Sequence, residues 1–134
     1  ISNKWNFELS HHYGLEKFYE FGASIVSCFN REYCKKLIVV LPNQKHPIHS
    51  HKLKEETFHV LWGDVAFNVD GEKQICSSGD IVTIERGKNH GFESANGGIF
   101  EEISTTHFKN DSFYDDETIF NNPNRKTELA YWVI

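Results

Sequence analysis

The 134-residue sequence lacks long apolar runs, closely spaced cysteine pairs and methionine. Its longest wholly apolar run, Leu37 to Leu41, is far shorter than the roughly 20 residues of a membrane helix, and the N-terminus lacks the apolar core of a signal peptide. We therefore expect a soluble, cytoplasmic protein without a membrane partner. Its three cysteines, Cys28, Cys34 and Cys76, are an odd number without CxxC spacing, which argues against a disulfide framework and against a zinc knuckle.

The charge distribution also lacks the basic stripe or tail of a nucleic-acid-binding protein. The 19 acidic side chains outnumber the 14 basic ones, and the formal net charge is −5. With 39% hydrophobic and 14% aromatic residues, the chain can bury one core but is too short for two ordinary domains. We expect one domain over residues 1–134, with a core at about 21–107 and a C-terminal extension at 108–134. Because the chain begins at Ile1 and has no methionine, we interpret it as a fragment of a longer protein.

Short apolar runs recur along the chain with turn residues between them, a pattern typical of an all-β sandwich or barrel. These runs are 24–29, 34–41, 57–62, 65–69, 81–84 and 99–104. Asp70-Gly71 predicts a two-residue hairpin, because a type I′ turn needs positive φ at both central positions. Further turns are expected at 63–64, 79–80 and 96–98. One short helical turn is expected at 15–20, between two glycines.

The C-terminal extension differs from the rest of the chain. An asparagine-rich stretch with a proline at 121–124 precedes an apolar end at 130–134. Exposed apolar side chains at a chain end are unusual in a monomer. We expect this end to pair as an edge strand, across a homodimer, or else to begin a segment that the sequence does not include.

His49, His51 and Glu56 form the first half of a predicted metal site. Residues two apart on a strand face the same side, so both imidazoles point the same way. Glu56 opens a strand in which it shares a face with Phe58 and Val60. A carboxylate aimed into an apolar barrel is costly unless a cation or a donor meets it, and the two imidazoles are matching ligands.

His90 supplies the second half of the predicted site. The strand at 81–84 leads into a glycine turn that returns His90 to the sheet. Three imidazoles and one carboxylate would leave one or two coordination positions for water or substrate. This ligand set suits one divalent transition metal, namely manganese, iron, zinc or nickel rather than calcium, and we favour manganese.

These segments resemble the paired motifs of the cupin superfamily. The first motif is HxH, four residues, Glu, six residues and Gly, and it is matched in full by His49, His51, Glu56 and Gly63. The resemblance implies an all-β, RmlC-like jelly-roll barrel, also called a double-stranded β-helix, in addition to the short N-terminal helical turn.

The second cupin motif is Gly, five residues, Pro, one residue, Gly, two residues and His. Gly79, Gly87 and His90 match it, whereas Glu85 stands where proline is usual and Ser94 where asparagine is usual. These departures affect the shape of a turn rather than the ligands.

The same residues allow other interpretations. An isolated His-x-His pair is commonly an ordinary surface feature. Glu55 is the rival carboxylate, but it would leave seven residues before the motif glycine and would face the opposite way. The remaining histidines are interpreted as surface or outer-shell groups, with His46 the best outer-shell candidate. They are His11, His12, His46, His59 and His107.

Lys54 and a glutamate on the last strand of the core are candidate catalytic groups. Lys54 lies two residues before Glu56, so in an extended chain it points to the same side. A lysine near a cation in a dry pocket loses its proton more easily, which suits it to proton transfer. The alternative is a solvated rim lysine. On the last strand, one of Glu101 and Glu102 must face inward.

Lys54 and the Glu102-Ile103-Ser104 segment resemble the pattern of D-lyxose isomerase-type cupins. In that family a metal, a lysine and a glutamate interconvert an aldose and a ketose. The resemblance therefore favours Glu102 for the pocket and implies that Lys54 and Glu102 are the catalytic pair.

A longer resemblance, over about 11–107, is to the cupin module appended to sialic-acid-synthase-type enzymes of bacterial surface-sugar biosynthesis. It rests on segments 11–14, 30–36, 54–58 and 101–107. It implies a small sugar or sugar acid as ligand and a covalently linked synthase domain as partner.

The first hypothesis for function is a metal-dependent, aldose–ketose isomerase-like domain. The ion would polarise the substrate carbonyl while Glu102 and Lys54 move a proton through an enediol. The second hypothesis is a non-catalytic, metal-dependent sugar-binding module that regulates a larger synthase. The third is an iron dioxygenase, which uses the same ligands.

Overall fold

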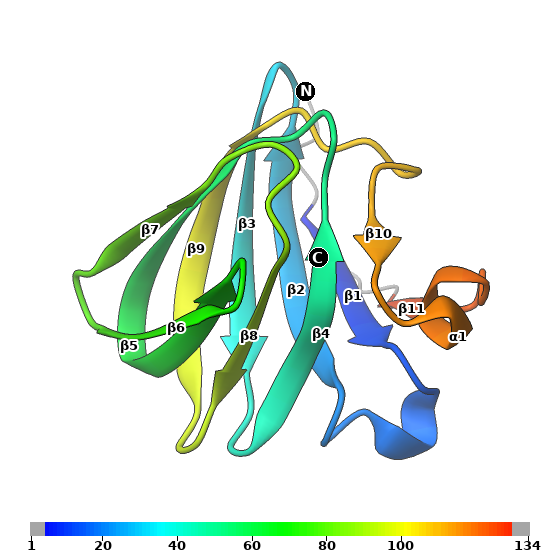
Figure 1. Ribbon diagram of the computed structural model, residues 1–134, viewed down its shortest axis with the longest axis horizontal. Coiled ribbons are helices and arrows are strands. Elements are labelled where there is room, and N and C mark those ends of the chain that lie inside the picture. Colours follow the sequence, from blue (N-terminus) through cyan, green and yellow to red (C-terminus); the bar gives the residue numbers. More distant parts are fainter. Residues whose placement is uncertain (1–4, 130–134) are drawn as a thin grey trace, which may run out of the picture.

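Alternating buried and exposed side chains run along most of the chain, which folds into one curled β-sheet (Figure 1). The computed structural model describes residues 5–129. Its strands are β1 (Asn6–His11), β2 (Gly22–Asn30), β3 (Tyr33–Val40), β4 (Gln44–Ser50), β5 (Glu56–Val69), β6 (Glu72–Ser77), β7 (Ile81–Ile84), β8 (His90–Ser94), β9 (Gly98–Thr105), β10 (Phe113–Tyr114) and β11 (Lys126–Leu129). A 3₁₀ turn at Leu15–Lys17 and the helix α1 (Glu117–Phe120) complete the elements. The predicted all-β class and the short N-terminal helical turn are confirmed.

The strands are hydrogen-bonded in the order β10-β4-β8-β5-β9-β3-β2-β1-β11, and β6 and β7 also pair with β5. A bridge between Phe21 and Lys45, and a 2.8 Å hydrogen bond from the Lys45 amide to the Glu20 carbonyl, join the start of β2 to β4. The sheet therefore curls until β4 faces β2 and encloses an interior (Figure 1). Within residues 5–129, no helix is both long and apolar enough to span a membrane.

Strand β5 passes from one side of the curled sheet to the other. Its first half pairs with β7 and β9, and its second half pairs with β6 and β8. The predicted turn at Gly63-Asp64 is wrong, because Gly63 lies inside this strand with a φ of 74°. Positive φ and a nearby register shift bend the strand without ending it. The hairpin predicted at Asp70-Gly71 is confirmed, with φ values of 50° and 87°.

The interior has an apolar half and a polar half. The apolar half centres on Phe58, Phe67, Phe92 and Phe100, whose ring centroids lie 5.0–6.4 Å apart. The polar half contains buried ionisable side chains from six strands. They include Glu8, Lys36, His49, Glu56, His90 and Glu102. Burying such groups is costly unless they have partners, so the polar half is where a functional site is to be sought.

Residues 108–129 return to the barrel and add a strand to each end of the sheet, as the orange segment of Figure 1 shows. β10 pairs with β4 at His49 and Ser50, and β11 pairs with β1. Asp116 caps α1 by accepting a 2.8 Å hydrogen bond from the Thr118 amide. The extension thereby reaches the polar half of the interior. The apolar end at 130–134, predicted to pair as an edge strand, lies outside the described residues.

Replacing Gly63 with alanine should destabilise the fold strongly. A Cβ there would lie 2.3 Å from the carbonyl oxygen of Gly97 and would sit on a residue with positive φ. Gly79 is the matched control, because it also has a positive φ, of 96°, but a Cβ there would meet no atom within 4 Å. We expect urea unfolding to show a loss of about 1 kcal/mol for Gly79→Ala and about 3 kcal/mol or more for Gly63→Ala. Equal losses would show that the close approach is not the constraint.

Candidate metal centre

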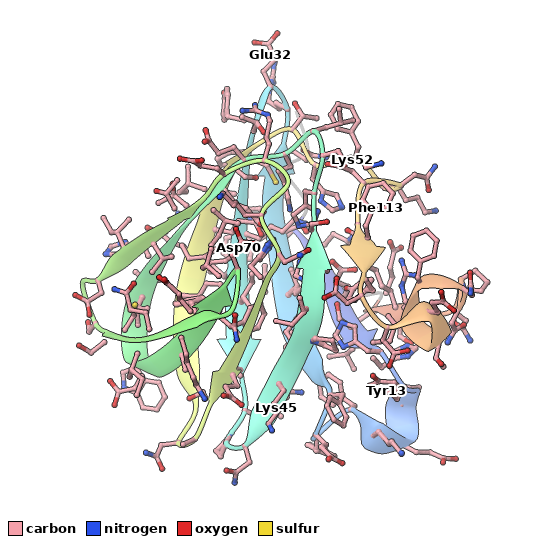
Figure 2. All side chains as sticks on the ribbon, viewed as in Figure 1. Tyr13, Glu32, Lys45, Lys52, Asp70 and Phe113 are labelled. Carbon is pink, nitrogen blue, oxygen red and sulfur yellow. The ribbon has the colours of Figure 1, made fainter. Side chains whose placement is uncertain are left out.

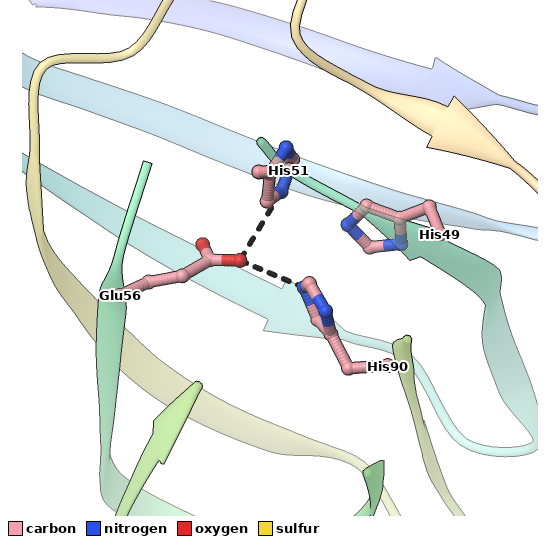
Figure 3. Close-up of side chains that lie close together, drawn as sticks. All are labelled: His49, His51, Glu56 and His90. Atoms are coloured by element: carbon pink, nitrogen blue, oxygen red, sulfur yellow. Dashed lines mark ion pairs between the residues drawn. The ribbon is translucent and has the colours of Figure 1, made fainter. Parts of the chain in front are cut away.

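Strands β4, β5 and β8, together with the residue that follows β4, bring four side chains together in the polar half: His49, His51, Glu56 and His90 (Figure 3). Each side chain offers one ligand atom, and these atoms all lie within 4.8 Å of one another. All four residues are buried. β4 and β8 pair directly at His49 and His90, which sets these two rings side by side. The structure therefore brings together the four residues that the sequence singled out as metal ligands.

Backbone carbonyls select the tautomer of the three imidazole rings. Each Nδ1 atom lies within hydrogen-bond distance of a carbonyl oxygen: 3.0 Å from His49 to Pro47, 2.7 Å from His51 to Asp111 and 2.9 Å from His90 to Lys88. A carbonyl oxygen only accepts hydrogen bonds, so each Nδ1 must donate its hydrogen. In a neutral ring, Nε2 then carries the lone pair, and this is the tautomer that binds a metal through Nε2.

Electron-rich atoms consequently face one another in the cluster (Figure 3). Oε1 of Glu56 lies 2.7 Å from Nε2 of His90 and 3.1 Å from Nε2 of His51. Oε1 of Glu56 and Nε2 of His90 are buried and receive no hydrogen bond. Such atoms repel unless a cation or a proton lies between them. Ligands about 2.1 Å from one ion lie about 3 to 4 Å apart, so the cluster could hold a small divalent cation.

The protonation of Glu56 and His49 also suits a cation. Burial by itself raises the pKa of Glu56, but the Lys54 ammonium group, 3.3 Å from Oε2, holds that pKa well below its ordinary value. Burial lowers the pKa of His49 well below its ordinary value, and so does the neighbouring His90. Glu56 is thus a carboxylate and His49 a neutral imidazole, which are the forms that bind metals.

Lys54 is buried beside the cluster and contacts three acceptors. Its Nζ lies 3.1 Å from Oε2 of Glu102, 3.3 Å from Oε2 of Glu56 and 3.3 Å from Nδ1 of His107. Burial lowers the pKa of Lys54, but the two carboxylates outweigh burial and raise the pKa above its ordinary value. The expectation that Lys54 loses its proton easily is therefore corrected. In this arrangement Lys54 is an ammonium group placed to donate protons, and it is not a solvated rim lysine.

The alternation of β9 separates the two adjacent glutamates. Glu102 faces inward, is 4% exposed and accepts a 3.1 Å hydrogen bond from the Ser104 hydroxyl. Glu101 faces the other side, where it lies 2.9 Å from Nδ1 of His59. Glu55, the rival of Glu56, has a side chain that is 42% exposed. Both carboxylates that the sequence analysis preferred are therefore the ones that face the interior.

Asp111, in the extension, connects the loop between β4 and β5 to the cluster. Its carboxylate accepts hydrogen bonds of 2.8–3.2 Å from the backbone amides of 52–54. Its carbonyl oxygen accepts the Nδ1 hydrogen of His51. Lys52 of the same loop also lies over the Phe113 ring, 4.5 Å from its centroid (Figure 2). Sequence analysis missed Asp111, because an aspartate in a polar stretch carries no local signal of this role.

Two further histidines continue the cluster away from its ligand atoms. A bulge in β4 turns both His46 and His49 inward, and their ring centroids lie 4.6 Å apart. His12 lies 4.4 Å from His46, and burial lowers the pKa of His12 to about 4. Tyr114 of β10 stacks on His49 at 5.2 Å. His46 thus lies where an outer-shell group would be, whereas His11 and His12 are buried rather than on the surface.

A cavity of about 50 Å³ opens beside the cluster. This volume accommodates about three or four water-sized groups. Its walls include Lys54, Glu102, Tyr114 and Lys36. The sequence analysis did not single out Lys36. The end of a small polar ligand can therefore lie next to His49, His51 and Glu56 and beside the Lys54–Glu102 pair.

Comparisons with known proteins agree with this geometry. The sequence model of the cupin domain family matches residues 36–101, a range that contains all four clustered side chains. A D-lyxose ketol-isomerase of Thermofilum sp. (strain ex4484_79) is 30% identical in an alignment that covers 85% of this chain and 76% of that protein.

Solved structures show the same fold. An RmlC-like cupin from Shewanella frigidimarina has a TM-score of 0.61 and 22% identity over 65% of this chain and 78% of its own. A protein with a double-stranded β-helix domain from Klebsiella pneumoniae has a TM-score of 0.59 and 18% identity over 63% of this chain and 76% of its own. At these identities the likeness concerns the fold alone, and it confirms the predicted double-stranded β-helix. Together with the family match and the 30% identical isomerase, it establishes that the chain belongs to the cupin superfamily.

Proposed function

We propose that His49, His51, Glu56 and His90 bind one divalent transition metal ion, with manganese favoured. The observation that carries this proposal is the set of three hydrogen bonds from Nδ1 atoms to backbone carbonyls. These bonds direct three Nε2 lone pairs and one carboxylate oxygen to a common region. Imidazole and carboxylate ligands together suit manganese, iron, zinc or nickel.

We further propose that the domain acts on a small sugar or sugar acid as an aldose–ketose isomerase. Two observations support this reaction: the 30% identity to a D-lyxose ketol-isomerase, and the Lys54–Glu102 pair beside the four proposed ligands. A divalent ion bound there would supply Lewis-acid polarisation of the substrate carbonyl.

In this proposal Glu102 and Lys54 move the protons. The Glu102 carboxylate removes the proton from the carbon next to the carbonyl, while the Lys54 ammonium group protonates the carbonyl oxygen, which gives an enediol. Lys54 then recovers a proton from the neighbouring hydroxyl, and Glu102 returns its proton to the former carbonyl carbon. The hydrogen bond from Ser104 orients Glu102, and His107 accepts a hydrogen bond from Lys54. Burial lowers the pKa of His107 to about 2, which keeps it an acceptor.

The resemblance of residues 11–107 to the cupin module of sialic-acid-synthase-type enzymes supports a proposal about the pathway and the partners of the domain. We propose that the domain works in bacterial surface-sugar biosynthesis of the sialic acid type, linked to a synthase domain, and that it forms a homodimer. A non-catalytic sugar-binding module and an iron dioxygenase are the competing functions, and the experiments below distinguish them.

Glu56→Gln should weaken Mn²⁺ binding by about 100-fold or more, because the carboxylate is the one charged ligand in the proposed set. Glu55→Gln is the matched control and should bind Mn²⁺ like the wild type, since its side chain points away from the cluster. Calorimetric titration of metal-free protein measures both, with one equivalent of Mn²⁺ expected for the wild type. Equal affinities in the wild type and Glu56→Gln would contradict the metal site.

Lys54→Met and Glu102→Gln should each lower kcat by at least about 100-fold, because each removes a proton-transfer group. Glu101→Gln, on the opposite face of the same strand, should leave kcat unchanged. The measurement is isomerisation of a panel of aldoses and their acids by the Mn²⁺-loaded domain in D₂O, with deuterium incorporation followed by NMR.

Unchanged rates in Lys54→Met and Glu102→Gln would remove the two catalytic assignments. Sugar binding by the wild type without any deuterium incorporation would favour the non-catalytic module. Oxygen consumption with Fe²⁺ would favour the dioxygenase.

Asp111→Ala should weaken Mn²⁺ binding and lower kcat, each by about 10- to 100-fold, because the loop at 52–54 loses its anchor and the Asp111 carbonyl that orients His51 is no longer held in place. Asp115→Ala is the control, because Asp115 is exposed. Calorimetry and steady-state kinetics measure the two effects. A variant that loses thermal stability but keeps the Mn²⁺ affinity and kcat of the wild type would show that Asp111 has a purely structural role.

A further inference from the structure

Lys36 is a buried lysine that neither the proposed metal site nor the proposed proton transfers use. The alternation of β3 places Lys36 on the same inward face as Cys34, Ile38 and Val40. Lys36 is opposite Glu102 in the β3–β9 ladder. It is 5% exposed, and its side chain lines the cavity that opens beside the cluster. A basic side chain therefore lies inside the barrel, on the wall of the proposed substrate site.

The other two lysines of this cavity have carboxylate partners. Lys54 contacts Glu56 and Glu102, and Nζ of Lys126 lies 3.4 Å from Oε2 of Glu8. Among residues 5–129, no carboxylate oxygen lies within 4.0 Å of Nζ of Lys36, and this Nζ makes no hydrogen bond. An unpaired buried ammonium group is costly, and burial lowers the pKa of Lys36 despite the attraction of Glu102. A ligand anion would supply the partner that the chain does not.

The charges around the cavity also favour an anionic ligand. Its acidic side chains are Glu8, Glu56 and Glu102, and its basic side chains other than histidine are Lys36, Lys54 and Lys126. These three carboxylates and three ammonium groups balance, so a divalent ion would add two positive charges that nothing in the wall neutralises. A cavity with excess positive charge and little water favours an anionic ligand.

We infer that the substrate is an anionic sugar whose charged end group binds Lys36 while its sugar oxygens reach the proposed metal site. This inference rests on the proposed function and names its substrate class, a sugar bearing a carboxylate or phosphate rather than a neutral aldose. The side chain of Lys126, 44% exposed, lies where the cavity reaches solvent, so it can attract such an anion during entry.

Calorimetric titration of the Mn²⁺-loaded protein tests the inference with matched ligands. The probes are D-glucose, D-glucuronate and D-glucose 6-phosphate, and the corresponding galactose and mannose series. We expect at least one acid or phosphate to bind about 10-fold or more tightly than its neutral counterpart. Lys36→Met should weaken that binding by about 10- to 100-fold, and Lys36→Arg should restore part of it. The phosphate and carboxylate probes decide which anion the site prefers.

Lys35→Met is the matched control, because Lys35 is the neighbour of Lys36 on β3 but faces outward, 3.4 Å from Glu101. It should leave all affinities unchanged. Neutral and acidic sugars bound equally, no binding of any anionic probe, or Lys36→Met binding like the wild type would each overturn the inference. If Mn²⁺ binds and neutral aldoses are isomerised, the proposed function survives such a result. If Mn²⁺ does not bind, the proposed function fails first.

Thermal unfolding without ligand gives a second readout. Methionine fills nearly the same volume as lysine and needs no partner, so Lys36→Met should unfold at the same temperature as the wild type or a higher one. We expect an equal or higher unfolding temperature in the variant if Lys36 is retained for ligand binding and not for stability. A Tm lowered by several degrees would mean that Lys36 stabilises the fold, and would overturn its role as a ligand-binding group.

Discussion

The site depends on three hydrogen bonds that imidazole Nδ1 atoms donate to backbone carbonyl oxygens. Because Pro47, Lys88 and Asp111 offer carbonyl oxygens to the Nδ1 atoms, the opposite nitrogens of the neutral rings present lone pairs. Those lone pairs lie close to a carboxylate, an arrangement that only a cation or a proton relieves. The pairing of β4 with β8 and of β10 with β4 holds these carbonyls in position. The fold thereby specifies ligand chemistry as well as ligand position.

The features that the sequence predicted follow from local periodicity. Two residues along a strand return a side chain to the same face, which is why a shared side could be predicted for His49 and His51, and for Lys54 and Glu56, without any structure. The burial of Lys54, in contrast, is known only from the structure. The hairpin at 70–71 followed from turn chemistry that involves neighbouring residues only. The inward orientation of Glu102 needed the family resemblance, since periodicity alone required one inward glutamate without identifying it.

The features that the sequence did not predict depend on contacts between distant segments or on breaks in periodicity. β5 continues through Gly63 because a glycine with positive φ can bend a strand as well as end it, and the sequence does not distinguish the two. The bulge in β4 brings His46 inward three residues before His49, where strict alternation would place it outside. Asp111 acts from the extension through its carboxylate and its own carbonyl. Each of these three features depends on strand pairing or contacts between distant segments, which cannot be predicted from a single sequence.

The distribution of carboxylates among the buried lysines is the strongest argument that the polar half is organised for binding rather than for stability. If pairing charges were all that mattered, each of the three lysines lining the cavity would have one carboxylate. Instead Lys54 has two, and Glu102, although opposite Lys36 in the ladder, places Oε2 against Lys54 and the Ser104 hydroxyl. Since the unpaired charge of Lys36 lowers stability, its retention on the cavity wall is explained when a ligand completes the pairing. The same reasoning applies to the lone pairs of the cluster. In our proposals, the two unsatisfied regions of the cavity therefore bind opposite charges, a cation at the cluster and an anion at Lys36.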